Sequence, residues 1–116
     1  NDPETNISGT VDVSPKFKDL VAAGDRLVIM LFDPELARPV AFRILENIQF
    51  PLDFRIGSAD AMPGVQLKGP FSLRILTDKN NQPFESAPGE LIVRSAEALP
   101  LGSHGLNFIL DQEYRR

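Results

Sequence analysis

Ten prolines and eight glycines divide this chain of 116 residues into short segments. A proline inside a helix removes a hydrogen bond and clashes with the preceding turn, and glycine weakens helices and strands alike. The breaks recur about every ten residues, which leaves no room for the repeated helices of an α/β domain. The spacing therefore favours short strands joined by turns.

Alternation of apolar and polar residues marks the strands between these breaks. Residues 7–13 place Ile7, Val11 and Val13 on one face. Residues 27–32 are apolar on both faces, which predicts a central strand with both sides covered. The other strands are expected at residues 39–45, 50–56, 71–76, 91–94 and 106–111.

Ser14 and Pro15 have the pattern of a helix start, with an N-cap followed by proline at the first helical position. We expect one short helix near residues 15–23, ending before Gly24. The predicted fold class is all-β, an antiparallel β-sandwich of about seven short strands. Residues 1–6 are expected to be a loose N-terminal segment, and residues 7–116 a single domain.

Composition narrows the possible functions. The net charge of −4 argues against a nucleic-acid binder, because such proteins bind mainly by neutralising phosphates. The chain has no cysteine, which excludes disulfides, thiolate catalysis and cysteine-ligated metal sites. No apolar run approaches the roughly 20 residues that cross a bilayer. We expect no enzyme activity and no cofactor.

The only histidine, His104, follows Ser103 in a segment rich in turn residues. Adjacent side chains on a strand point to opposite faces, so these two do not predict a nucleophile and its base. We expect His104 in a solvated turn. The alternative is a copper site with Met62, because imidazole and thioether suit copper. Carboxylates that could serve a hydrolase are expected mainly in turns or at strand ends instead, namely Asp25, Asp33, Asp60, Asp78 and Glu90.

Three arginines alternate with apolar residues in three predicted strands: Arg43, Arg55 and Arg74. If those strands are neighbours, the guanidinium groups form a ladder on one outer face that could recognise carboxylates. The alternative is a solvated face with partners such as Asp53 and Glu46.

The irregular segment 59–69 offers a second candidate binding surface. Its apolar residues Met62, Val65 and Leu67 could form a contact loop, or they could cover the end of the core.

Short motifs occur in a characteristic order along residues 7–112. They are Gly-Thr-Val-Asp-Val-Ser-Pro at 9–15, Asp-Arg-Leu-Val-Ile at 25–29, Phe-Pro-Leu-Asp-Phe at 50–54, Ala-Met-Pro-Gly at 61–64 with Leu67, Arg-Ile at 74–75, Pro-Gly-Glu-Leu at 88–91, and Leu-Asn-Phe-Ile-Leu-Asp at 106–111. In this order the chain resembles the periplasmic C-terminal domain of the cytochrome c-type biogenesis subunit that presents apocytochrome c to the haem lyase.

That resemblance implies a periplasmic or secreted β-sandwich without catalysis, whose partners are apocytochrome c or cytochrome assembly subunits. Membrane association is expected only through segments absent from this chain, including a membrane or lipid anchor in a full-length form. The chain lacks a Cys-x-x-Cys-His motif, so we expect it to carry no covalent haem. Two other functions stay open, an accessory module of a larger cell-envelope protein and a copper-binding module.

Overall fold

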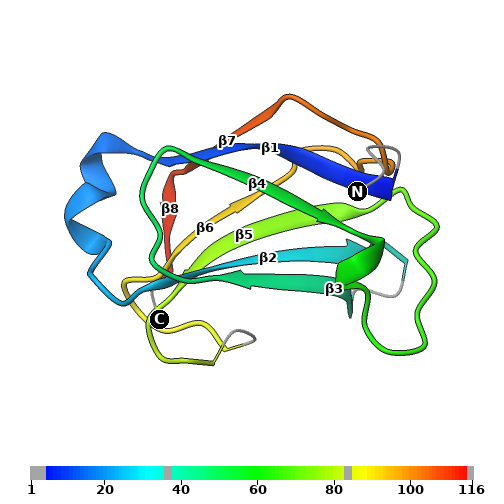
Figure 1. Ribbon diagram of the computed structural model, residues 1–116. Coiled ribbons are helices and arrows are strands. Elements are labelled where there is room, and N and C mark those ends of the chain that lie inside the picture. Colours follow the sequence, from blue (N-terminus) through cyan, green and yellow to red (C-terminus); the bar gives the residue numbers. More distant parts are fainter. Residues whose placement is uncertain (1–4, 36–37, 83–84, 115–116) are drawn as a thin grey trace.

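Two β-sheets pack face to face in the computed structural model, which describes residues 5–35, 38–82 and 85–114 (Figure 1). This arrangement confirms the predicted all-β sandwich. Most of the N-terminal segment expected to be loose, residues 1–4, lies outside the described residues. Asn6, the last residue of that segment, already belongs to the first strand.

The smaller sheet has three strands in the order β4-β1-β7. They are β1 (Asn6–Val13), β4 (Leu52–Gly57) and β7 (Leu106–Leu110). β1 pairs antiparallel with β4 but parallel with β7, which departs from the fully antiparallel sandwich that we predicted. Parallel neighbours need a long crossover connection, and here four of the five strands of the larger sheet lie between β1 and β7 in the sequence.

The larger sheet has five strands in the order β3-β2-β5-β6-β8, all antiparallel. Its strands are β2 (Arg26–Asp33), β3 (Arg38–Leu45), β5 (Ser72–Asp78), β6 (Leu91–Arg94) and β8 (Gln112–Glu113). The sequence pattern did not predict β8, which has two residues and follows β7 directly. β8 extends the larger sheet, so the chain changes sheet at residue 111.

The predicted short helix is a 3₁₀ helix, η2 (Pro15–Leu20), and it ends three residues earlier than expected. Ser14 caps it with its backbone carbonyl, which accepts a hydrogen bond from Phe17 N at 2.9 Å. Phe17 and Leu20 pack against the core. Side chains three residues apart are aligned on a 3₁₀ helix, so both lie half-buried on the same side of this short turn. A second 3₁₀ turn, η3 (Ser58–Asp60), follows β4.

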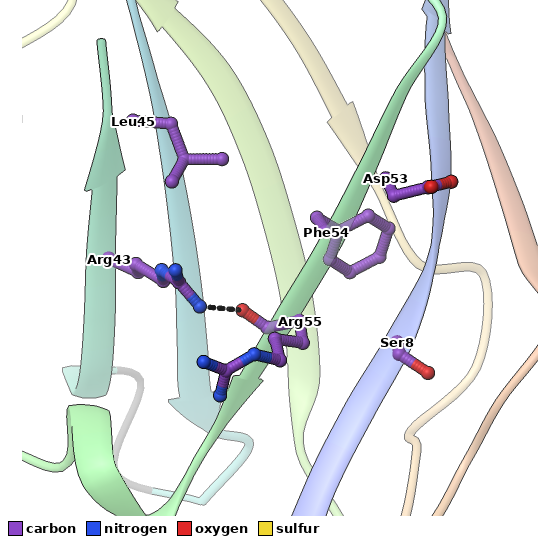
Figure 2. A pocket seen from close by; sticks show the side chains of 6 residues that line it. All are labelled: Ser8, Arg43, Leu45, Asp53, Phe54 and Arg55. Atoms are coloured by element: carbon purple, nitrogen blue, oxygen red, sulfur yellow. Dashed lines mark hydrogen bonds between the residues drawn. The ribbon is translucent and has the colours of Figure 1, made fainter. Parts of the chain in front are cut away.

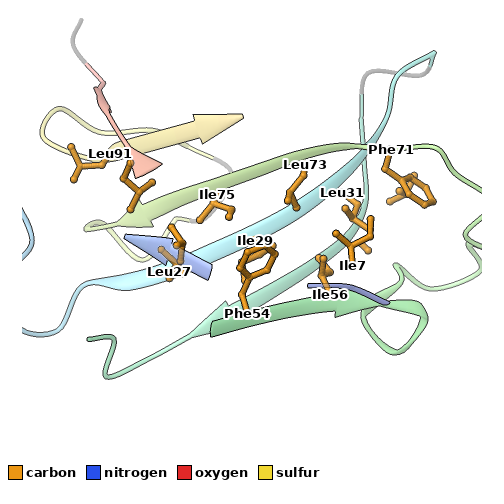
Figure 3. Close-up of a cluster of buried hydrophobic side chains, with 14 of the residues drawn as sticks. Ile7, Leu27, Ile29, Leu31, Phe54, Ile56, Phe71, Leu73, Ile75 and Leu91 are labelled. Atoms are coloured by element: carbon orange, nitrogen blue, oxygen red, sulfur yellow. The ribbon is translucent and has the colours of Figure 1, made fainter. Parts of the chain in front are cut away.

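The core fills the space between the two sheets (Figure 3). β2 contributes Leu27, Ile29 and Leu31, none of which has exposed surface. The opposite face of β2 is also buried, because Val28 and Met30 belong to a second apolar cluster with Leu76 on the outer side of the larger sheet. The prediction that residues 27–32 form a central strand with both sides covered is therefore confirmed. Within the described ranges, no helix has the length and hydropathy to cross a bilayer.

Candidate functional site

A groove of about 300 Å³ lies where the edge strand of one sheet faces the edge strand of the other (Figure 2). We call it the seam groove. β3 of the larger sheet and β4 of the smaller sheet form its two sides. Six residues line it: Ser8, Arg43, Leu45, Asp53, Phe54 and Arg55.

One hydrogen bond crosses the seam groove. Arg43 Nη1 donates to the carbonyl oxygen of Arg55 at 3.3 Å, as Figure 2 shows. Arg43 pairs with Ile29 across the larger sheet, so its side chain leaves β3 on the core-facing side. Since β3 is an edge strand, the side chain reaches across to β4. The Arg55 side chain points away from the core, because Ser8, its partner in the β1–β4 pair, lies on the outward face of β1.

The backbone of β4 faces the seam at alternate residues. In a strand, the N–H and C=O of one residue point to the same edge, and successive residues alternate. Arg55 O accepts its bond from the seam side, and Gly57 N donates to Asp60 Oδ2 at 3.0 Å. By the same alternation, the N–H and C=O of Asp53 point away from β1 into the seam. The start of β4 thus directs backbone groups toward the groove.

The neighbouring edge of β3 is covered over its first half only. Met62 N donates to Val40 O at 2.8 Å, and Ala61 forms a bridge with Ala41. Within the described residues, no strand pairs with this edge beyond that bridge. The second half of β3 and the first half of β4 are therefore the part of the seam without a strand neighbour.

The structure brings together two of the three predicted arginines. Arg43 and Arg55 line the same groove, whereas Arg74 lies on β5, on the outer face of the larger sheet. The condition for one arginine ladder, that the three strands are neighbours, is not met, because β3 and β5 are separated by β2, and β4 belongs to the other sheet. The proposed partners Asp53 and Glu46 form no ion pair with Arg43, since the two ion pairs of the described residues lie elsewhere.

The irregular segment after η3 covers the core. Val65 and Leu67 are half-buried and pack against the central cluster. Val65 N also donates to Met62 O at 3.0 Å, which folds the segment back on itself. This placement agrees with the interpretation of the segment as a cover over the end of the core. Partner binding by Met62, Val65 and Leu67 stays a prediction.

His104 is exposed, and its Nδ1 lies 2.9 Å from Ser8 Oγ. Ser103, its neighbour in sequence, donates instead to Pro100 O at 2.8 Å. A hydrogen bond of this length is what a nucleophile and its base require, but among the described residues no third group orients the imidazole. Met62 donates its backbone N–H to β3 of the larger sheet, whereas His104 contacts Ser8 on β1 of the smaller sheet. The described part of the chain also has no cluster of three His, Asp or Glu side chains that could hold a metal.

Three buried carboxylates were not recognised in the sequence as buried: Asp25, Asp78 and Glu90. The Glu90 oxygens accept from Lys79 N at 2.7 Å and Ala87 N at 2.8 Å. Asp25 Oδ2 accepts from Ala22 N at 2.9 Å and from Lys79 Nζ at 2.6 Å. These carboxylates hold turns in place.

The sequence carried one signal for this network. Asp25 and Asp78 each precede a basic residue, and the pairs cross, with Arg26 bound to Asp78 and Lys79 bound to Asp25. The crossed pairing can be recognised only once the antiparallel register of β2 and β5 is known, because that register places Arg26 opposite Asp78.

No family model matches the sequence, and neither the curated proteins nor the solved structures contain a match to this chain.

Proposed function

We propose that this domain is a non-catalytic protein- or peptide-binding module that receives an extended segment of its partner in the seam groove. The observation that carries the proposal is the open seam, where two edge strands meet beside Arg43 and Arg55. An extended peptide can add to a sheet edge through main-chain hydrogen bonds, and side-chain pockets then select its sequence.

The lining of the seam groove favours a partner segment that has both apolar and acidic side chains. Leu45 and Phe54 supply an apolar surface, and the two guanidinium groups supply donors for a carboxylate. Asp53 adds one negative charge at the same place, so a single carboxylate is better matched than a strongly acidic run. The proposed ligand is an extended stretch with apolar residues and one acidic side chain.

The class of partner rests on the resemblance in the ordered motifs. We propose that the domain acts in the periplasm, in the assembly of c-type cytochromes, and that its partner is apocytochrome c or another assembly subunit. Before haem is attached, an apocytochrome chain is unfolded and its backbone is available for strand addition. A folded holocytochrome has used those backbone groups in its own structure, so the domain should prefer the apo form.

Calorimetry with purified apocytochrome c and holocytochrome c tests this proposal. We expect binding of the apo form, and a loss of about tenfold in affinity for Arg43→Gln, because one charge-assisted hydrogen bond is removed. Lys68→Gln is the matched control, since Lys68 is exposed and lies outside the groove lining. The control should bind like the wild type.

Three results would overturn the proposal. Equal affinity for the apo and holo forms would exclude recognition of an extended chain. Equal losses in Arg43→Gln and Lys68→Gln would exclude the seam groove. Absence of binding to both forms would exclude the cytochrome partner and favour the accessory-module alternative.

A further inference from the structure

A pair of arginines that forms no ion pair with any described residue lies on the outer face of the larger sheet, away from the seam groove. Arg74 on β5 is directly opposite Arg94 on β6 in the antiparallel register. On its other side Arg74 is paired with Met30 of β2. Like charges placed directly opposite each other destabilise a sheet, so this pair needs a physical reason.

Arg74 is incompletely satisfied within the part of the chain that the structure describes. Its Nε is buried and has no hydrogen-bond partner there. The guanidinium carbon lies 4.3 Å from the centre of the Phe32 ring, a cation–π contact. Burial, and secondarily the charge of Arg94, lower the pKa of Arg74. Among the described residues, neither of the two ion pairs includes Arg74 or Arg94.

A hollow of about 290 Å³ adjoins this pair. Its walls are mainly apolar, and Arg74 is its only charged residue; the lining consists of Met30, Phe32, Pro39, Arg74, Leu76, Ser86 and Ile92. Arg94 lines the next hollow, which shares Ile92 with the first. Asp111 and Glu113 also line that second hollow, and neither of the two ion pairs among the described residues joins them to Arg94.

The apolar surface continues beyond the hollow. Phe42 and Ile44 of β3 are half-buried and pack against the same outer cluster. Val28, Met30 and Leu76 of this cluster are buried, so the accessible apolar strip consists of the half-buried side chains Phe32, Phe42, Ile44 and Ile92, with the arginine pair at the β5–β6 end. The facing like charges of Arg74 and Arg94 and the unsatisfied Nε of Arg74 are the features that a ligand with an acceptor would complement.

We propose that this outer face binds a protein partner through one acidic side chain flanked by apolar residues, with the carboxylate on the Arg74–Arg94 pair. A carboxylate matches the planar fork of arginine, and its single charge would offset the repulsion between the two guanidinium groups. The apolar strip accommodates the flanking side chains. A multiply charged ligand is disfavoured, because the chain itself carries a net charge of −4.

This second surface does not depend on the seam groove. Arg74 projects from the outer face of the larger sheet, whereas Arg43 leaves its strand on the core-facing side. A ligand in one site leaves the other free, so each can be tested without the other.

An NMR titration of the isotope-labelled chain tests the proposal with four probes. These are acetyl-Leu-Asp-Leu-amide, its asparagine analogue, acetate and inorganic phosphate. We expect the aspartate peptide to shift the amide resonances of Arg74, Ile92 and Arg94, with an affinity about tenfold higher than that of the asparagine peptide. Acetate and phosphate should bind at least tenfold more weakly than the aspartate peptide, because they leave the apolar strip uncovered.

Two variants locate the site. Arg74→Met keeps the apolar stem and removes the charge, and Arg94→Gln changes an exposed side chain that cannot be needed for folding of the core. Both should abolish the preference for aspartate over asparagine, whereas the seam variant Arg43→Gln should keep it.

The proposal is overturned if the asparagine peptide binds as tightly as the aspartate peptide, or if acetate alone does. It is equally overturned if Arg94→Gln retains the preference for aspartate, or if the shifts are confined to Asp53 and Arg55 of the seam groove.

Discussion

Arg26 Nη2 lies 2.6 Å from Asp78 Oδ2, and Arg26 Nε donates to the same oxygen at 3.1 Å. The Asp78 side chain has no exposed surface, while that of Arg26 is 21% exposed. The other oxygen of Asp78 accepts from Asn80 N and Gln82 N. One buried carboxylate therefore joins β2 to β5 and also fixes the turn that follows β5.

Asp78→Ala should lower the free energy of unfolding by about 3 kcal/mol, since it leaves the Arg26 guanidinium and two turn amides without an acceptor. Urea unfolding followed by circular dichroism measures the change. Asp53→Ala is the control, because Asp53 is an exposed strand aspartate, and its substitution should stay within about 0.5 kcal/mol. Equal losses in the two variants would contradict the role of the buried pair.

The strands and the core were predictable because they depend on local sequence. Ile7, Val11 and Val13 alternate with polar residues, and all three are buried. The double-faced apolar pattern of residues 27–32 indicated a strand with neighbours on both sides, and β2 has them. A period of two residues follows from the strand backbone itself, so it is visible without knowledge of the fold.

The candidate site was harder to predict because it depends on which strands are neighbours. Arg43, Arg55 and Arg74 have the same local pattern, yet they leave three different sheet faces, and only Arg43 and Arg55 meet, at the seam groove. Alternation shows that a side chain leaves one face, but the order of strands decides what lies beside it. The burial of Asp78 was missed for the same reason, since its partner Arg26 is 52 residues away in sequence.

Gly9 allows β7 to approach β1. A Cβ atom built on Gly9 would lie 2.2 Å from the carbonyl oxygen of Leu106, which is its partner in the parallel pair. Gly9→Ala should therefore destabilise the domain by about 3 kcal/mol, because backbone must move to admit the methyl group. Thermal unfolding compares it with Gly64→Ala.

Gly64 is the matched control because its methyl group would meet no atom within 4 Å, although its φ is +78°. That variant should lose about 1 kcal/mol from backbone conformation alone. A loss in Gly9→Ala no larger than that in Gly64→Ala would contradict the close approach.

The segment after η3 can be tested as a cover over the core. Leu67 is half-buried and packs against the central cluster, so Leu67→Ala should cost about 1 to 2 kcal/mol, less than a fully buried leucine. Met62 is not part of that cluster, and Met62→Ala should cost about half as much. Chemical unfolding distinguishes them, and the reverse order would indicate that the segment contacts the core through Met62.

The arginine pair on the outer face makes a prediction about the free domain. Because burial and Arg94 lower the pKa of Arg74, the charged form of Arg74 is less stable in the folded than in the unfolded chain. Removing Arg94 relieves the second cause without disturbing the contact of Arg74 with the Phe32 ring. Arg94→Gln should therefore raise the free energy of unfolding, by up to about 1 kcal/mol.

Arg74→Met should raise the free energy of unfolding by less than Arg94→Gln does, because it also loses the contact with the Phe32 ring. Arginine as a residue type does not titrate near neutral pH, so the gain in Arg94→Gln should be constant between about pH 5 and pH 9. It should shrink as sodium chloride is raised, since salt screens the repulsion between the two guanidinium groups. Urea unfolding at low and high salt measures both effects. A loss of stability in Arg94→Gln at low salt would show that an acceptor within the chain already neutralises the arginine pair. The outer face would then need no carboxylate from a partner.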